Sequence, residues 1–171
     1  YDRGRPLHVY DLKKLKGAIH ARMAKAGETV IALNDKTYTL DPTMCVIADD
    51  TGAHDIGGIM GSNATGSDEG TTDVLIECAY FDPVSIATTG RKLGLTSDAR
   101  YRFERGVDPA FIEPGLDLAT ALIMEIAGGT PTKKTIAGKP PIKEHVIDFD
   151  MGRVEKLAGL KLEDSTIKGT L

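Results

Sequence analysis

The stretch Asp55–Phe81, DIGGIMGSNATGSDEGTTDVLIECAYF, decides how the rest of the chain is interpreted. Five glycines fall in its first part, at positions 57, 58, 61, 66 and 70. Glycine lets a backbone adopt positive φ or approach a ligand closely. The short apolar run Val74–Ala79 that follows is typical of a buried strand, and it contains Glu77, whose carboxylate needs a partner there. The stretch therefore predicts a pocket in which a glycine-lined wall faces a half-buried acid.

The composition is that of one ordinary globular domain with a small attachment. The 171 residues are 41% hydrophobic and 27% charged, and the net charge of −4 excludes general attraction to polyanions, so a nucleic-acid contact needs a local patch. The sequence has no apolar run of membrane-spanning length and no signal-peptide pattern. Cys45 and Cys78 lie in apolar runs outside any CxxC, which favours small buried side chains in a reducing compartment. We expect a cytoplasmic protein.

The first half of the chain carries the signals of short strands separated by turns. Asp11 is suited to cap a short turn over Leu12–Leu15 that ends at Gly17. Alternation, β-branched residues and flanking turn residues indicate strands at 19–23, 29–33, 37–40 and 44–48, followed by a turn at Asp49–Gly52. Together with the run at 74–79, these segments predict a β-sheet core.

The second half carries helix signals. Asp82 and Pro83 are suited to the N-cap and first position of a helix over Val84–Leu93, and Asp108 with Pro109 repeats this device before a long amphipathic segment that stops at Gly128. We interpret the arginine-rich stretch Leu95–Gly106 as a loop. A short strand at 145–149, a short helix at 151–158 and a further element from residue 163 complete the expected order.

This order predicts an α+β fold, with a mixed β-sheet core and packed helices, in three parts. Residues 1–129 form the main domain, and residues 130–144, rich in proline, lysine and glycine, form a linker. Residues 145–171 begin a second, small helical domain. Because the chain starts at Tyr1 without a methionine and ends inside a helix-like segment, we expect a piece cut from a longer protein.

Several standard sites are excluded by their missing motifs. The sequence has no GxxxxGK[ST] or GxSxG motif, and the glycines at 57–61 lack the strand–helix context of a dinucleotide site. The histidines at positions 8, 20, 54 and 145 lack metal-ligand spacing, so we expect no metal site and no covalent nucleophile.

The remaining candidates each allow a structural and a functional interpretation. Glu77 either points outward from an edge strand or accepts a hydrogen bond from a ligand hydroxyl in an apolar pocket. His8, on an extended segment after a proline, is either a surface residue or a pocket residue. Ser97 and Ala99 suit either a tight turn or the space beside a ligand. The arginines at 91, 100, 102 and 105 form either a solvated face or a local phosphate site, and at least one of them should pair with Asp98, Glu104 or Asp108.

Four segments resemble one known family. GRPLHVYD (Gly4–Asp11) is similar to the GQPLHAFD segment of the bacterial phenylalanyl-tRNA synthetase beta subunit. GGIMGSNATG, VLIECAYFDP and GRKLGLTSDARYRFERGVDP continue the match in the same order and with preserved spacing. The resemblance covers residues 1–129, the B3/B4-type editing domain of that subunit, and the tail from His145 resembles the start of the domain that follows it.

The resemblance implies hydrolytic proofreading of tyrosine attached by mistake to the phenylalanine tRNA. Glu77 matches the glutamate that recognises the tyrosine hydroxyl, and Gly61 matches a glycine beside it. Ser97 and Ala99 match small pocket residues, with Ser97 standing where the family commonly has threonine. His8 matches a pocket histidine with a possible catalytic role. Among the arginines, Arg100 and Arg102 are the candidates for contact with tRNA.

The same resemblance implies partners and a mechanism. The parent would be a heterotetramer of two alpha and two beta subunits that binds ATP and magnesium elsewhere, so no cofactor is expected in this chain. Hydrolysis would use a positioned water, with backbone amides of the glycine wall or of the Ser97 loop stabilising the oxyanion. The family pocket also uses an arginine and an asparagine upstream of the GRPLH segment, before this chain begins. The rival hypothesis is a non-catalytic tRNA-binding or scaffolding module.

Overall fold

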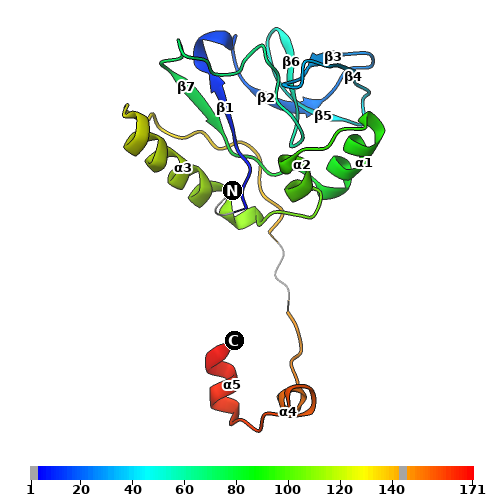
Figure 1. Ribbon diagram of the computed structural model, residues 1–171, viewed down its shortest axis with the longest axis vertical. Helices are drawn as coiled ribbons and strands as arrows, with labels where there is room; N and C mark the ends of the chain where they lie inside the picture. Colours follow the sequence, from blue (N-terminus) through cyan, green and yellow to red (C-terminus); the bar gives the residue numbers. More distant parts are fainter. Residues whose placement is uncertain (1–3, 143–145) are drawn as a thin grey trace. The chain divides into compact units, whose positions relative to one another are not determined.

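The computed structural model describes residues 4–142 and 146–171. The chain divides into two compact units, Tyr1–Pro141 and Ile142–Leu171. The predicted division into domains at 1–129 and 145–171, joined by a linker, stays a prediction. The strands and the first three α-helices belong to the first unit (Figure 1).

The strands are short and lie in the first half of the chain. In order they are β1 (His8–Asp11), β2 (His20–Met23), β3 (Thr29–Ile31), β4 (Thr37–Thr39), β5 (Cys45–Asp49), β6 (Gly52–Ile56) and β7 (Val74–Glu77). A 3-10 turn, η1 (Leu12–Lys14), follows β1, and Asp11 caps it by accepting a hydrogen bond from the Lys13 amide, as the sequence predicts.

The helices follow in the second half. They are α1 (Pro83–Leu93), α2 (Asp98–Phe103), the 3-10 turn η2 (Pro109–Phe111) and α3 (Ile112–Ala127) in the first unit, with α4 (Gly152–Ala158) and α5 (Asp164–Thr170) in the second. Asp82 caps α1 by accepting a hydrogen bond from the Ser85 amide, Pro83 occupies its first turn, and Gly94 ends it in the left-handed conformation. Among the described residues, no helix combines the length and the apolar character needed to cross a bilayer.

The described strands pair in three small antiparallel sheets, β1–β7, β2–β5–β6 and β3–β4. In Figure 1, β1 and β7 lie side by side with α3 next to β7, while α1 and α2 lie together. The predicted α+β class, with a β-sheet core and packed helices, is confirmed.

The core lies where the central strand β5 meets the glycine-rich loop after β6 and the first two helices. Val46 of β5, Ile56 of β6 and Ile86 of α1 are all at most 2% exposed. Phe81, just before α1, packs edge-on against Phe103 of α2, with 5.1 Å between the ring centroids. Burial of these apolar side chains fixes α1 and α2 against the loop that carries the glycines.

Three sequence predictions differ from the structure. The stretch Leu95–Gly106 is not all loop, because Ser97 caps α2 and Phe103 anchors that helix in the core. The sequence does not predict the strand β6, because its glycine, histidine and aspartate lack the alternating apolar pattern of a strand. The segment is ordered by pairing with β5. The predicted strand at 145–149 is wrong for Val146–Phe149, which has no neighbouring strand among the described residues to receive its backbone hydrogen bonds; His145 lies outside those residues.

A pair of glycine variants should separate the cost of backbone strain from the cost of lost space. Gly58 (φ +69°) would place a Cβ 2.7 Å from Cδ2 of Phe81, whereas Gly27 (φ +75°) has nothing within 4 Å of its Cβ position. Gly27→Ala should lower the free energy of unfolding by about 1 kcal/mol from the left-handed backbone alone. Gly58→Ala should lower it by about 3 kcal/mol, because overpacking is added. Urea unfolding measures both, and equal losses would contradict the packing argument.

Candidate functional site

A cavity of about 390 Å³ is lined by all five residues that the sequence singled out as a pocket. They are His8, Gly61, Glu77, Ser97 and Ala99. They come from β1, the loop after β6, β7 and the start of α2, so four separate segments build one site. Apolar side chains supply much of the remaining wall, among them Ile59 and Phe81. The volume lies within the range of small-molecule sites.

The pairing of β1 with β7 brings the two polar pocket residues together. His8 lies directly opposite Glu77 in the antiparallel register. Side chains at opposite positions of such a pair project from the same face, with Cβ atoms about 5 Å apart. Tyr10, two residues after His8, shares that face, and its ring packs edge-on against the imidazole at a centroid distance of 4.5 Å.

Asp55 lies at the centre of this polar cluster, and sequence reasoning missed its role. Its carboxylate accepts a hydrogen bond from the Tyr10 hydroxyl and another, at 3.0 Å, from the Ser62 amide. His8 Nε2 lies 3.8 Å from the same carboxylate. Burial raises the pKa of Asp55, and the neighbouring His8 and the two hydrogen bonds oppose that rise. The available signal was an aspartate between His54 and Ile56, in a strand that the sequence did not reveal.

Two polar atoms in the cavity have no hydrogen-bond partner among the described residues. They are Oε1 of Glu77 and Nε2 of His8, and both are buried. Burial raises the pKa of Glu77 from its ordinary 4.5 to about 7; the nearby Asp55 adds to the rise and Arg5 opposes it. Near neutral pH, Glu77 therefore exists in both protonation states. It can accept a hydrogen bond as a carboxylate or donate one as an acid.

Gly61 and Ser97 fix the shape of the cavity. A Cβ at Gly61 would overlap the His8 ring, so only glycine leaves room for the imidazole. The Ser97 hydroxyl caps α2 by accepting a hydrogen bond from the Arg100 amide at 3.0 Å, and it donates to the Ile59 carbonyl at 2.6 Å. Ser97 therefore ties α2 to the glycine-rich loop, and Ala99 follows on the first turn of the helix with a side chain small enough to leave the cavity open.

The arginines near α2 are largely engaged with their own helix. Arg100 binds Glu104 Oε2 at 2.9 Å and also donates to the Leu95 carbonyl, and it packs against Gly90. Arg102 donates to the Asp98 carbonyl at 3.0 Å, and Arg105 binds Glu104 Oε1 at 2.9 Å. The prediction that at least one arginine pairs with Asp98, Glu104 or Asp108 is confirmed.

The chemistry available in the cavity is that of hydrogen bonding and proton transfer. It offers two acids of raised pKa, Glu77 and Asp55, one imidazole, and largely apolar walls. Over residues 4–142 and 146–171, no group of three His, Cys, Asp or Glu side chains is placed to hold a metal ion. Such an arrangement suits recognition of a polar group on an otherwise apolar ligand.

With this geometry established, comparison with known proteins gives the family. The B3/4 domain model matches residues 1–128, and the chain belongs to that family. The chain is also 54% identical over its whole length to the phenylalanine–tRNA ligase beta subunit of Bradyrhizobium diazoefficiens, of which it covers 21%. The subunit of the same name from Nitrobacter winogradskyi is 55% identical over 94% of the chain and 20% of that protein. The chain thus spans about a fifth of the length of these curated relatives.

The raised pKa of Glu77 predicts a specific loss of stability with rising pH. The unfolded chain releases this proton near pH 4.5 and the folded chain near pH 7, so folding is penalised progressively between these values and fully above them. Glu77→Gln removes the ionisation. Relative to this variant, the wild type should lose about 3 kcal/mol of unfolding free energy between pH 5 and pH 8.

Urea unfolding at both pH values measures this difference. Glu69→Gln, at an exposed glutamate of the same glycine-rich stretch, is the matched control and should follow the wild type. A Glu77→Gln variant with the pH dependence of the wild type would mean that Glu77 ionises as an exposed acid does.

Proposed function

We propose that this chain is part of a phenylalanine–tRNA ligase beta subunit and hydrolyses tyrosine from mischarged phenylalanine tRNA. One observation carries the proposal. Oε1 of Glu77 is buried without a hydrogen-bond partner among the described residues and lines a largely apolar cavity. A tyrosine side chain is an apolar ring with a single hydroxyl, so it matches a slot of this composition. The similarity to subunits of that ligase supports the same assignment.

The selectivity follows from the cost of leaving Glu77 unpaired. Tyrosine supplies a hydroxyl that completes the hydrogen bonding of the carboxylate. Phenylalanine fills the same volume but leaves a buried acceptor unsatisfied, which costs about 1–3 kcal/mol for a neutral group and more for a charged one. Sites built to bind a substrate hydroxyl reject the analogue without it by about 10⁴-fold. Such a pocket spares correctly attached phenylalanine.

Hydrolysis in this proposal uses a water molecule. The water oxygen attacks the ester carbonyl carbon, the bond from that carbon to the ribose oxygen breaks, and the ribose oxygen takes a proton. Tyrosine leaves as a free amino acid. His8 would orient or deprotonate the water; its Nε2 has no hydrogen-bond partner among the described residues and lies 3.8 Å from the Asp55 carboxylate. Backbone amides of the glycine-rich loop are the candidates to stabilise the oxyanion.

The proposal includes the assembly implied by the relatives. The chain would act within a beta subunit that pairs with an alpha subunit, as two of each, and binds the phenylalanine tRNA. ATP and magnesium would bind elsewhere in the assembly, where the amino acid is attached.

Substitution of Glu77 in the complete synthetase tests the proposal. Glu77→Ala should raise net attachment of tyrosine to the tRNA and slow deacylation of tyrosyl-tRNA at least tenfold, because the hydroxyl loses its partner. Ala99→Trp should give the same result by filling the cavity. Both are measured by release of labelled tyrosine from preformed tyrosyl-tRNA, beside the rate of phenylalanine attachment.

Glu69→Gln is the control and should leave both rates unchanged. If Glu77→Ala slows phenylalanine attachment and leaves tyrosine release intact, Glu77 is a structural acid. If the wild-type synthetase releases no tyrosine, the chain is instead a tRNA-binding or scaffolding module.

A further inference from the structure

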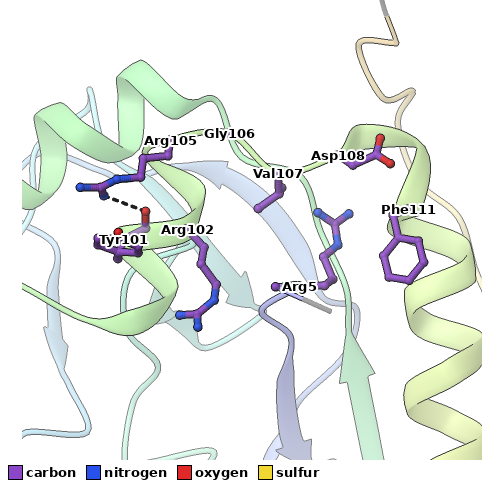
Figure 2. Close-up of a pocket in the computed structure, with 9 residues that line it drawn as sticks. Arg5, Tyr101, Arg102, Arg105, Gly106, Val107, Asp108 and Phe111 are labelled. Atoms are coloured by element: carbon purple, nitrogen blue, oxygen red, sulfur yellow. Dashed lines mark hydrogen bonds between the residues drawn. The ribbon is translucent and has the colours of Figure 1, made fainter. Parts of the chain in front are cut away.

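Figure 2 shows a second cavity, of about 510 Å³, which is lined by neighbouring residues of the segments that line the first. Its lining includes Gly4, Arg5, Tyr101, Arg102, Arg105 and Asp108. Three arginines and one aspartate thus belong to the lining, in a chain whose net charge is −4; outside the lining, the Glu104 carboxylate binds Arg105 at 2.9 Å. The Asp108 carboxylate already accepts the Ala110 amide at 2.9 Å. Within its lining, the cavity, called here the basic cavity, therefore has more arginines than carboxylates.

Arg5 is the unusual member of this lining. It is only 8% exposed, and none of its three side-chain nitrogens has a nitrogen or oxygen hydrogen-bond partner in the described part of the chain; its polar neighbour is the Cys78 thiol, where it opposes the rise in pKa that burial causes. No carboxylate among those residues lies within ion-pair distance of it, although its charge lowers the pKa of Glu77. Its stem packs at the start of α3, where a Cβ on Gly115 would lie 3.4 Å from its Cγ. A buried guanidinium without an anion is costly, so this side chain fits a site that an anion completes.

The other two arginines are held in place on α2 and just after its end. The Arg105 guanidinium lies 3.7 Å from the centroid of the Tyr101 ring and donates to the Tyr101 carbonyl, the bond dashed in Figure 2. Arg102 donates to the Asp98 carbonyl and lies 3.9 Å from the Asp98 carboxylate. Guanidinium groups match the planar pairs of oxygens on phosphate, and positioned ones lose little entropy on binding.

The two cavities share their supporting segments. Gly4 and Arg5 line the basic cavity, while the next three residues, Pro6 to His8, line the site with Glu77. Arg102 on α2 and Arg105 just after it line the basic cavity, while Ala99 and Phe103 of α2 line the site with Glu77. An anion bound by Arg5 therefore lies next to the bound amino acid. In an aminoacyl-tRNA, the ester is carried by the terminal ribose, and the nearest anion is the phosphate of that same nucleotide.

We propose that Arg5, Arg102 and Arg105 form a phosphate subsite that binds the terminal nucleotide of the tRNA while the amino acid occupies the cavity with Glu77. The assignment of the phosphate to tRNA rests on the proposed function. The inference that the arginines bind a phosphate group does not depend on it. The resembling segment GQPLHAFD has glutamine where this chain has Arg5. Arg5→Gln introduces that residue, removes the positive charge and is the variant expected to fold.

Amide NMR of the isotope-labelled chain tests the subsite without any hydrolysis. Adenosine 5′-monophosphate should shift the amides of residues 4–5 and 101–108 saturably, and adenosine should not. Arg5→Gln and Arg105→Gln should each weaken binding at least fivefold, and raising the salt concentration should weaken it further. Arg91→Gln, at an exposed arginine outside both cavities, is the matched control and should bind as the wild type does.

The remaining probes distinguish the possible sources of the phosphate. An RNA oligonucleotide ending in CCA should bind at least tenfold more tightly than inorganic phosphate and shift the same amides. Equal affinity for the two would overturn the tRNA assignment and leave a free-phosphate site. No shift with any phosphate, or equal binding by Arg5→Gln, would overturn the subsite itself. If the nucleotide binds here but the synthetase releases no tyrosine, the proposed hydrolysis fails and the phosphate subsite stands.

Discussion

The antiparallel pairing of β1 with β7 is the constraint on which the candidate site depends. It sets His8 opposite Glu77 and places Tyr10 on the same face, within reach of Asp55 from another sheet. A shift of one residue in this register would turn these side chains to the opposite face of the sheet. The backbone hydrogen bonds of two four-residue strands therefore determine whether His8 and Glu77 face the cavity.

The two buried acids of the same cluster, Asp55 and Glu77, differ in how well the protein compensates their burial. Asp55 is satisfied by the Tyr10 hydroxyl and the Ser62 amide, while Oε1 of Glu77 lacks a partner among the described residues. One of the two neighbouring acids is thus held by the protein, and the other is left to a ligand or to a proton. Unsatisfied buried groups of this kind cluster where stability is given up for binding, because a saturated cavity has no hydrogen-bonding capacity left to offer.

Local sequence signals predicted much of the fold and part of the site. Glu77 stood out because it is the one acid in a short apolar run, and the capping residues Asp11 and Asp82 act as their local chemistry indicates. The strand β6, and with it Asp55, could not be found this way because it is ordered by distant pairing with β5. Its sequence, GAHDI, has no alternation of apolar and polar residues that would indicate a strand. Burial of Arg5 likewise depends on α3, more than a hundred residues further along the chain.

The Ser97 hydroxyl joins α2 to the Ile59 carbonyl, and this one contact has a geometric consequence. The helix has only six residues, about 9 Å of rise, and it contributes to both cavities. Because one short helix lines both cavities, a shift of α2 would change the shape of both. On the proposed assignments, α2 holds the amino-acid site and the phosphate subsite at the spacing of one aminoacylated nucleotide. A free amino acid would fill only the site with Glu77. The fold would then measure whether an amino acid is attached to RNA as well as which amino acid it is.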